Sequence, residues 1–327
     1  MNFNIYNPFR NLEFEDHICF LSGKETQNSI TVFPEWLMKR FNFDQDAFEM
    51  MDKVNKLSYS DLKMPCSEEV EQAINKMDEK VKAAFDLGFE AMKKVDDILL
   101  FQWIGRIVYG VLYHEMSLEK KRMIKYNKDF EVSPFLKERY GNFHLMLQSL
   151  ISPISFSEKR PWTISLFQLK YSADIFSYRD DAVNLMFQLG INGFGFVAAL
   201  QDNGAIGEKQ AEVLEKIKGH VLHPIQFEEL YARFHYSEYI FQYQPQYEIS
   251  KTEDGIFIEA VPIVADQNRP LFGHWDDDMF AQVLANYWQV YGIEKKDILK
   301  FQKPPISFLE NPYTKDFVNP ENIKLPF

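Results

Sequence analysis

The spacing of apolar residues differs between the first and second halves of this chain, and this difference limits the possible folds most strongly. Residues 67–150 place apolar side chains at three- and four-residue spacing, which is the period of an α-helix. From residue 162 onward, segments that alternate with a period of two, as half-buried strands do, are mixed with further helical segments. Helices that precede the strands favour an α+β fold with an antiparallel sheet over a doubly wound parallel sheet.

One of the predicted helices is apolar almost all round, and we expect it at the centre of the core. It covers residues 96–116, where Gly105 and Gly110 would let a neighbouring element approach closely. Arg106 lies in its middle, and a buried arginine needs a carboxylate or carbonyl partner, either as a core ion pair or in the wall of a pocket. The other helices of this half are predicted at 34–41, 67–88 with Ser67 as N-cap, and 134–150 after a basic loop.

The second half of the chain predicts a sheet with helices around it. Asn192-Gly193 and Asp254-Gly255 are tight-turn dipeptides between alternating segments, which is typical of hairpins. The predicted strands cover 162–171, 183–189, 194–200, 247–251 and 256–261. The predicted helices cover 205–218 (solvated), 224–241 and 276–291, and a proline-rich tail from residue 304 is expected along the surface.

Composition excludes several classes of protein. The chain has 327 residues and a formal net charge of −12, which argues against a main task of coating nucleic acid or an anionic membrane. Its two cysteines exclude a disulfide framework and an intact four-cysteine metal cage. Residues 1–10 lack the pattern of a signal peptide, and the longest apolar stretch, 98–113, is shorter than the roughly 20 residues of a membrane span. We therefore expect a cytoplasmic protein without a membrane partner.

Three short stretches near the N-terminus carry a resemblance to a known family. They are Cys19-Phe-Leu-Ser22, Ile30-Thr-Val-Phe-Pro34-Glu-Trp36-Leu37 and Pro65-Cys66-Ser67-Glu-Glu-Val70. In this order they resemble a bacterial HNH-type endonuclease group built on a treble-clef zinc finger. That group has a Cys-x2-Cys knuckle, then Glu-His-x2-Pro-x-Trp-Leu, then Pro-Cys-Cys-x2-Cys-Asn; four thiolates hold a structural zinc ion and the histidine is the general base. The stretches at 101–107 and 199–204 also look similar to that group.

The scaffold positions of this pattern are retained and the chemical ones are not. Ser22 stands at the second zinc ligand, Ser67 and Val70 stand at the second pair of thiolates, and Thr31 stands at the histidine. A neutral hydroxyl is a poor zinc ligand, valine has no donor atom, and threonine cannot accept a proton near pH 7. The resemblance therefore implies a degenerate treble-clef-like segment at 1–66, packed as one compact unit on an α+β body at 67–327. It assigns no catalytic residue, no cofactor and no metal ligand.

One pair of histidines and one run of aspartates are candidate ion sites elsewhere in the chain. His220-x2-His223 has a spacing that suits a metal, but it precedes a proline, as a polar loop before a helix does. The aspartates Asp276–Asp278 could hold a divalent cation, or they could cap a helix N-terminus.

Further histidines and a basic run complete the candidates. His17 could replace the missing base or be an ordinary loop residue, and His235 is expected to be half-buried and hydrogen-bonded among aromatic side chains. The segment Lys120–Lys128 is the main basic concentration; it could contact nucleic acid, or it could complement the C-terminal dipole of the preceding helix.

Three hypotheses about function follow. The first is a non-catalytic HNH-like relic that binds a partner, protein or nucleic acid, or has a regulatory role, and it is the one that the pattern of losses favours. The second is a hydrolase with a relocated site, which would use His220, His223 or the aspartates Asp276–Asp278. The third is a nucleic-acid-binding module without cleavage, which would use Lys120–Lys128.

Overall fold

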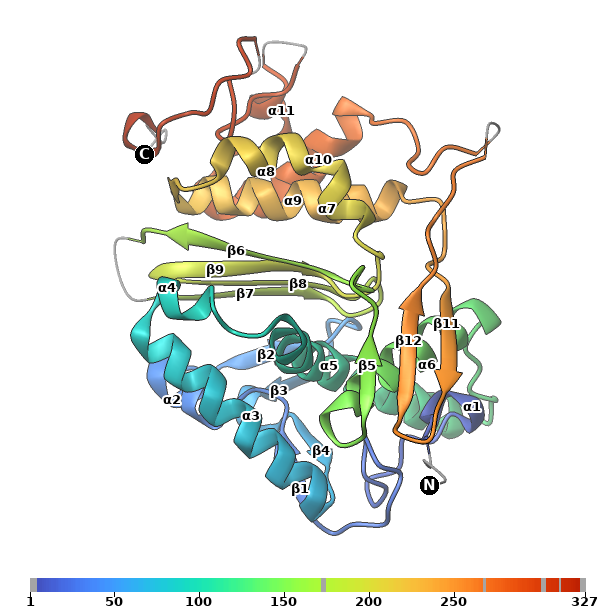
Figure 1. Ribbon diagram of the computed structural model, residues 1–327. Helices are drawn as coiled ribbons and strands as arrows, with labels where there is room; N and C mark the ends of the chain where they lie inside the picture. Colours follow the sequence, from blue (N-terminus) through green and yellow to red (C-terminus); the bar gives the residue numbers. More distant parts are fainter. Residues whose placement is uncertain (1–4, 172–174, 267–268, 301–303, 312, 324–327) are drawn as a thin grey trace. The chain divides into compact units, whose positions relative to one another are not determined.

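A computed structural model describes residues 5–171, 175–266, 269–300, 304–311 and 313–323. Residues 1–4 of the predicted N-terminal segment and 324–327 of the predicted tail lie outside the described residues. The chain is α+β, as predicted (Figure 1). It forms two compact units: unit 1 comprises residues 1–158, 181–185 and 247–259, and unit 2 comprises 159–180, 186–246 and 260–327. Residues 66 and 67 both belong to unit 1.

Unit 1 begins with short elements joined by two small hairpin-like pairings. Antiparallel pairing joins β1 to β4, with Ile30 opposite Met64, and β2 to β3, with Phe48 opposite Leu57. Pro34 is the N-cap of α2, in agreement with the predicted short helix. The elements are α1 (Pro8–Asn11), β1 (Ser29–Thr31), α2 (Glu35–Phe41), β2 (Ala47–Glu49), β3 (Lys56–Ser58), η1 (Tyr59–Asp61) and β4 (Lys63–Pro65).

The core of unit 1 surrounds one long helix, α5 (Asp97–Lys125). Its buried residues follow one another from Trp103 to Tyr113 without interruption, which confirms the prediction that it is central. A Cβ added at Gly110 would lie 2.6 Å from Val32, and one at Gly105 would lie 2.6 Å from Leu147 of α6, so both glycines permit close approach as predicted. Among the described residues no helix is long and apolar enough to cross a membrane.

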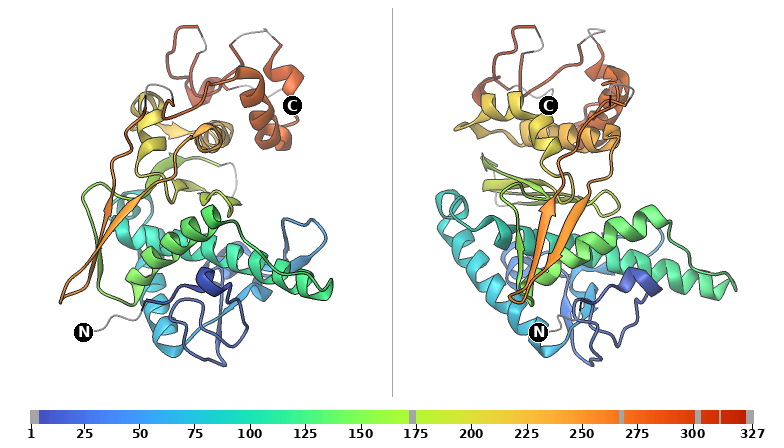
Figure 2. Two further views of the ribbon diagram at one scale, coloured as in Figure 1. Left: turned by 90° about the vertical axis from the view of Figure 1, so that its right-hand side faces the viewer. Right: turned by 45° about the vertical axis from the view of Figure 1, so that its right-hand side comes forward.

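Helices α3 and α6 of unit 1 begin where the sequence predicts, whereas α1 and α4 are not predicted. The apolar stripe of α3 (Glu68–Leu87) starts after Ser67 and ends at Gly88, whose φ is +85°. The remaining elements are α4 (Phe89–Met92), α6 (Pro134–Leu147), η2 (Gln148–Leu150), β5 (Ile154–Phe156), β11 (Tyr247–Lys251) and β12 (Ile256–Ala260) (Figure 2). The sheet order is β11–β12–β5, and β12 runs parallel to β5.

Two predictions about α5 and its surroundings are wrong. The helix does not end near Met116 but continues to Lys125, and the first part of the predicted basic loop is therefore helical. The last two turns have no apolar stripe, which is why the periodicity missed them. They consist mostly of strong helix formers, and Lys120 pairs with Glu15, so the turns form without a buried face.

Unit 2 is built on a five-stranded sheet with the order β10–β6–β9–β8–β7 (Figure 1). The central pairs β6–β9 and β8–β9 are antiparallel, as predicted, whereas the short edge strand β10 runs parallel to β6. The strands are β6 (Thr163–Leu169), β7 (Phe176–Asp181), β8 (Met186–Ile191), β9 (Gly193–Ala199) and β10 (Val221–Leu222). Strand β7 is not predicted, because Tyr178-Arg-Asp-Asp has no apolar alternation.

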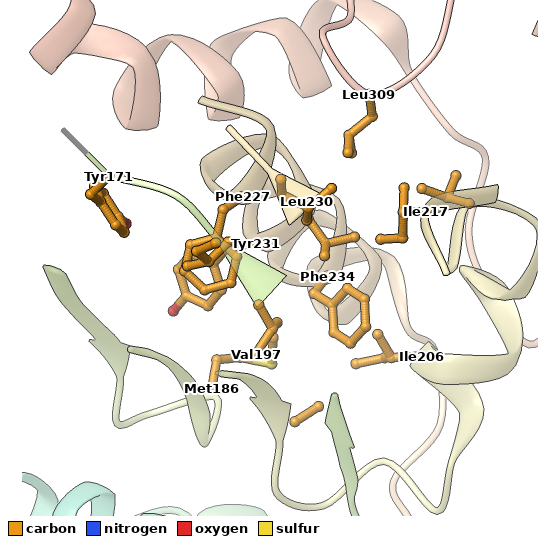
Figure 3. Packing of buried hydrophobic residues seen from close by; sticks show 14 residues of the cluster. Tyr171, Met186, Val197, Ile206, Ile217, Phe227, Leu230, Tyr231, Phe234 and Leu309 are labelled. Carbon is orange, nitrogen blue, oxygen red and sulfur yellow. The ribbon is translucent and has the colours of Figure 1, made fainter. Parts of the chain in front are cut away.

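Helix α9 (Pro224–Ile240) packs on one face of this sheet. A Cβ added at Gly190 or Gly195 would lie within 3 Å of Phe227, so the missing side chains bring helix and sheet together. The buried cluster between them includes Met186, Val197, Leu230 and Phe234 (Figure 3). The other elements are α7 (Ala205–Lys209), α8 (Ala211–Ile217), α10 (Asp277–Trp288), η3 (Gln289–Tyr291), α11 (Lys295–Ile298) and η4 (Pro320–Asn322).

The structure has two short helices where a single solvated helix was predicted at 205–218. It is divided at Gln210 into α7 and α8, and Gln210 is buried with its Nε2 donating to Ser237 Oγ of α9 at 2.8 Å. Ile206 and Val213 enter the buried cluster on α9. A tertiary hydrogen bond therefore breaks a helix that its local sequence would continue.

Candidate functional site

The two stretches that resemble the halves of a zinc knuckle, Cys19 to Ser22 and Cys66 to Ser67, lie together in unit 1. A tight turn closes Cys19 to Lys24: Gly23 N donates to Cys19 O at 3.0 Å, and Gly23 has a φ of +69°. Phe20 N donates to Pro65 O at 2.9 Å, which brings this turn beside the end of β4. As a result the hydroxyls of Ser22 and Ser67 lie 3.2 Å apart and hydrogen-bond to each other.

The side chains at this place do not fit a structural zinc ion. The Ser22 and Ser67 hydroxyls are engaged with each other, and Val70 is fully buried in the apolar face of α3. Cys19 and Cys66 are fully buried, and a tetrahedral zinc site of this kind needs four donors, usually thiolates or imidazoles. Among the residues that the structure describes, no group of three or more His, Cys, Asp or Glu side chains is placed to hold a metal ion.

The two thiols belong to the same polar cluster. Cys66 Sγ donates to Ser67 O at 3.6 Å. The interaction with Cys66, with help from the hydroxyls of Ser22 and Ser67, lowers the pKa of Cys19, and burial opposes this effect. The interaction with Cys19 raises the pKa of Cys66. An ion pair between Lys24 and Glu69 closes the turn onto the first turn of α3 from outside.

Thr31, at the position where the resemblance has a general base, is tied to the backbone. Its Oγ1 donates to Phe33 O at 2.7 Å, at the end of β1. His17 lies exposed in the preceding loop.

Arg106 is the buried cation beside this region. Its Nη1 donates to Asp78 Oδ2 at 3.2 Å and its Nη2 donates to Val32 O at 3.1 Å, so both partners considered from the sequence are present. Burial raises the pKa of Asp78 and the positive charge of Arg106 opposes that rise. Arg106 therefore holds the end of β1 against α3 and α5 rather than presenting its charge to solvent.

The candidate ion sites in unit 2 are helix caps. His223 Nδ1 accepts from Ile225 N at 3.2 Å, and His223 N donates to Gln226 Oε1, which forms a capping box on α9. Asp276 Oδ1 accepts from the amides of Asp278 and Met279 as the N-cap of α10. Asp277 and His223 line different cavities, so these groups do not converge in one site.

The remaining candidates also have structural partners. His220 stacks on Phe317 with ring centroids 4.4 Å apart, and His235 lies half-buried between the rings of Tyr231 and Tyr287. In the basic segment, Lys120 donates to Glu15 and to Leu12 O, Lys121 pairs with Asp16, and Arg122 pairs with Glu119. Three cations of the segment are thereby neutralised locally.

Sequence reasoning missed a buried polar cluster in unit 2. Glu228 of α9 is 3 % exposed, and its carboxylate accepts from Arg179 Nε at 2.9 Å and from Ser177 Oγ at 3.4 Å. Burial raises the pKa of Glu228, and the Arg179 charge opposes it. Gln188 lies beside this carboxylate, fully buried, without a hydrogen bond of ordinary geometry from either amide atom.

A signal for this cluster exists in the sequence. Glu228 and Glu229 are consecutive in a helix with apolar residues on both sides of them, and consecutive side chains point about 100° apart, so the pair extends the charge beyond a narrow polar stripe. The missing half is Arg179, which comes from the unpredicted strand β7.

We compared the chain with models of protein families, with curated proteins and with solved structures. None of these three comparisons gives a match.

Proposed function

We propose that this protein is a non-catalytic relative of the HNH-type endonucleases, which has lost both zinc and general base and is retained for a binding or regulatory role. The observation that carries the proposal is the convergence of Cys19, Ser22, Cys66 and Ser67. Residues 45 positions apart in sequence meet as the two halves of a knuckle do, yet their donor atoms bond to one another.

The energetics support replacement of the metal by packing. A structural zinc ion contributes an apparent folding free energy of about 10 kcal/mol. Five large apolar side chains near the former knuckle, at about 2 kcal/mol each, would match that amount. They are Phe20, Leu21, Val32, Phe33 and Leu37, all buried.

The proposal is tested by metal analysis of the purified protein together with a restoration variant. For the unchanged chain we expect less than 0.1 zinc per chain by plasma mass spectrometry, and the same melting temperature with and without a chelator. The triple variant Ser22→Cys, Ser67→Cys, Val70→Cys supplies three thiols beside Cys19, and we expect it to bind about one zinc ion per chain and to melt at a lower temperature after chelation.

Three results would contradict the proposal. One tightly held zinc ion in the unchanged protein would remove the argument for loss of the metal. Metal-dependent cleavage of DNA or RNA that is abolished by Thr31→Ala would contradict the loss of catalysis. A triple variant that folds but binds no zinc would argue against descent from a zinc knuckle.

A further inference from the structure

Unit 2 contains a cavity that none of the preceding roles uses. Its volume is about 820 Å³, within the range of small-molecule sites. It lies where the end of β6, the edge strand β10, the N-terminus of α9 and the short helices η3 and η4 meet. The side chains that matter for its chemistry are Lys170, His223, Tyr291 and Asn319.

Lys170 and Tyr171 follow β6 and line this cavity in different ways. Lys170 is exposed at the rim, so its ammonium group is a first hydrogen-bond donor to the cavity. Tyr171 is 8 % exposed and its Oη is fully buried, at a place where a Cβ at Gly190 would lie 2.6 Å from it. The phenol therefore points toward the sheet and Ser177, away from the cavity. The residue lies at the border of the buried cluster (Figure 3).

His223 is fixed in one tautomer by the helix that it caps. Because its Nδ1 accepts the amide hydrogen of Ile225, the neutral ring carries its proton on Nε2. Burial lowers the pKa of His223, which keeps the ring neutral at pH 7. The imidazole thus contributes a second donor to the same cavity.

The other polar groups are mostly donors as well. Asn319 Oδ1 accepts the amide of Glu321, which leaves the NH2 group of Asn319 for another partner. Burial raises the pKa of Tyr291, so its phenol stays protonated. The carboxylate of Glu321 is the acidic group of the lining and lies on the exposed side.

The rest of the lining is apolar. It comprises Ile175, Val221, Leu222, Pro224 and Pro320. A ligand that matches this wall has an apolar body, and a ligand that matches the donors has an oxygen-rich anionic end. From these two walls we infer that the cavity binds a small organic anion, in which a carboxylate or a phosphate is carried on an apolar body.

The inference is independent of the N-terminal segment and of the proposed loss of zinc. It is tested by isothermal titration of the full chain with 1-naphthoate and 1-naphthyl phosphate, which share a body and differ in the anion. The uncharged 1-naphthalenemethanol and inorganic phosphate serve as probes for the body alone and the anion alone. We expect one of the two naphthyl anions to bind at least tenfold more tightly than either partial probe, and the preferred one identifies the anion class.

Two variants locate the binding. Lys170→Gln should weaken the preferred anion about fivefold or more and leave binding of the alcohol unchanged, whereas the control Lys218→Gln, at an exposed lysine paired with Glu215, should change neither. Asn319→Asp keeps the oxygen that accepts the amide of Glu321 and replaces the NH2 donor by a carboxylate oxygen, so it should weaken the anion about tenfold.

Several results would overturn the inference. They are equal binding of the anions and the alcohol, no binding of either anion up to 10 mM, or unchanged affinity in both Lys170→Gln and Asn319→Asp. The melting temperature of Asn319→Asp shows whether that variant is folded, so a loss of binding cannot be mistaken for unfolding.

Discussion

The two units bury charges of opposite sign and use them in the same way. In unit 1 the cation Arg106 donates to the carbonyl of Val32, in the loop after β1. In unit 2 the anion Glu229, fully buried in α9, accepts from the amides of Phe308 and Leu309 and from Ser307 Oγ. Each buried charge ties irregular backbone to a helix, and its sign follows from whether the loop presents carbonyls or amides.

The largest expected effect comes from removing the cation of unit 1. Arg106→Met leaves the Asp78 carboxylate buried without its partner, and we expect it to lower the free energy of unfolding by about 3–5 kcal/mol. Urea unfolding, with hydrogen exchange read on peptides of each unit, measures the loss and shows whether unit 1 carries it.

The matched control is an exposed pair in the same unit. Arg40→Met removes a partner of Asp86 at the surface and should cost no more than about 1 kcal/mol. Equal losses for the two variants would show that burial of the charge is not what distinguishes Arg106.

The second prediction uses pH to separate the units. Burial lowers the pKa of His144 to about 4 and raises that of Asp202 to about 7, from their ordinary values of 6.5 and 3.8. The neutral imidazole of His144 therefore contributes fully to the free energy of unfolding above pH 6.5, and this contribution is lost as the pH falls to about 4. The protonated carboxyl of Asp202 contributes fully below about pH 4, and its contribution is lost as the pH rises to about 7. Each amounts to about 3–4 kcal/mol.

Non-titrating variants isolate these two contributions. The difference in unfolding free energy between the unchanged chain and His144→Gln should increase with pH between 4.5 and 6.5. The difference between the unchanged chain and Asp202→Asn should decrease over pH 4.5 to 7. Slopes of the same sign would break the contrast between a buried neutral imidazole and a buried carboxyl.

The third prediction concerns the anion of unit 2. Glu229→Gln removes the charge and one acceptor oxygen, so part of the set formed by Arg233, Ser307 and two backbone amides loses its acceptor. We expect a loss of about 2 kcal/mol and faster hydrogen exchange in residues 304–311. The exposed Glu215→Gln, which loses only its pair with Lys218, should leave that exchange unchanged.

The smallest expected effect lies in the basic segment. Lys121→Ala breaks an exposed pair with Asp16 and should change the unfolding free energy by less than about 0.5 kcal/mol. Lys120→Ala should cost about 1 kcal/mol, because Lys120 also donates to Leu12 O and is mostly buried. A larger loss for Lys121 than for Lys120 would contradict the assignment of their roles.

Periodicity predicted the elements whose stability comes from one apolar face. The stripe of α3, the all-round apolar surface of α5 and the hairpin at Asn192-Gly193 were recognised because burial and local propensity agree there. Strand β7 and the last turns of α5 were missed because polar side chains form them, held by neighbours that are distant in sequence.

The candidate sites divide in the same way. The cap at Asp276 was anticipated as an alternative to ion binding, since capping depends on a few consecutive residues. His223 was expected only in a polar loop before a helix, and the structure shows that it caps that helix. The Arg179–Glu228 pair could not be anticipated, because its halves come from a strand and a helix 49 positions apart. The HNH-like ancestry stays a proposal that the restoration variant tests.

The sequence by itself determined the α+β class, the central position of α5 and the need of Arg106 for a partner, because each follows from the period of apolar residues or from the cost of burying a charge. Packing of the whole chain set which atoms meet that need, brought the hydroxyls of Ser22 and Ser67 together and placed the donors that line the cavity of unit 2. Hydrogen bonds between distant segments have no local signature, since they depend on distances that exist only after the chain has packed.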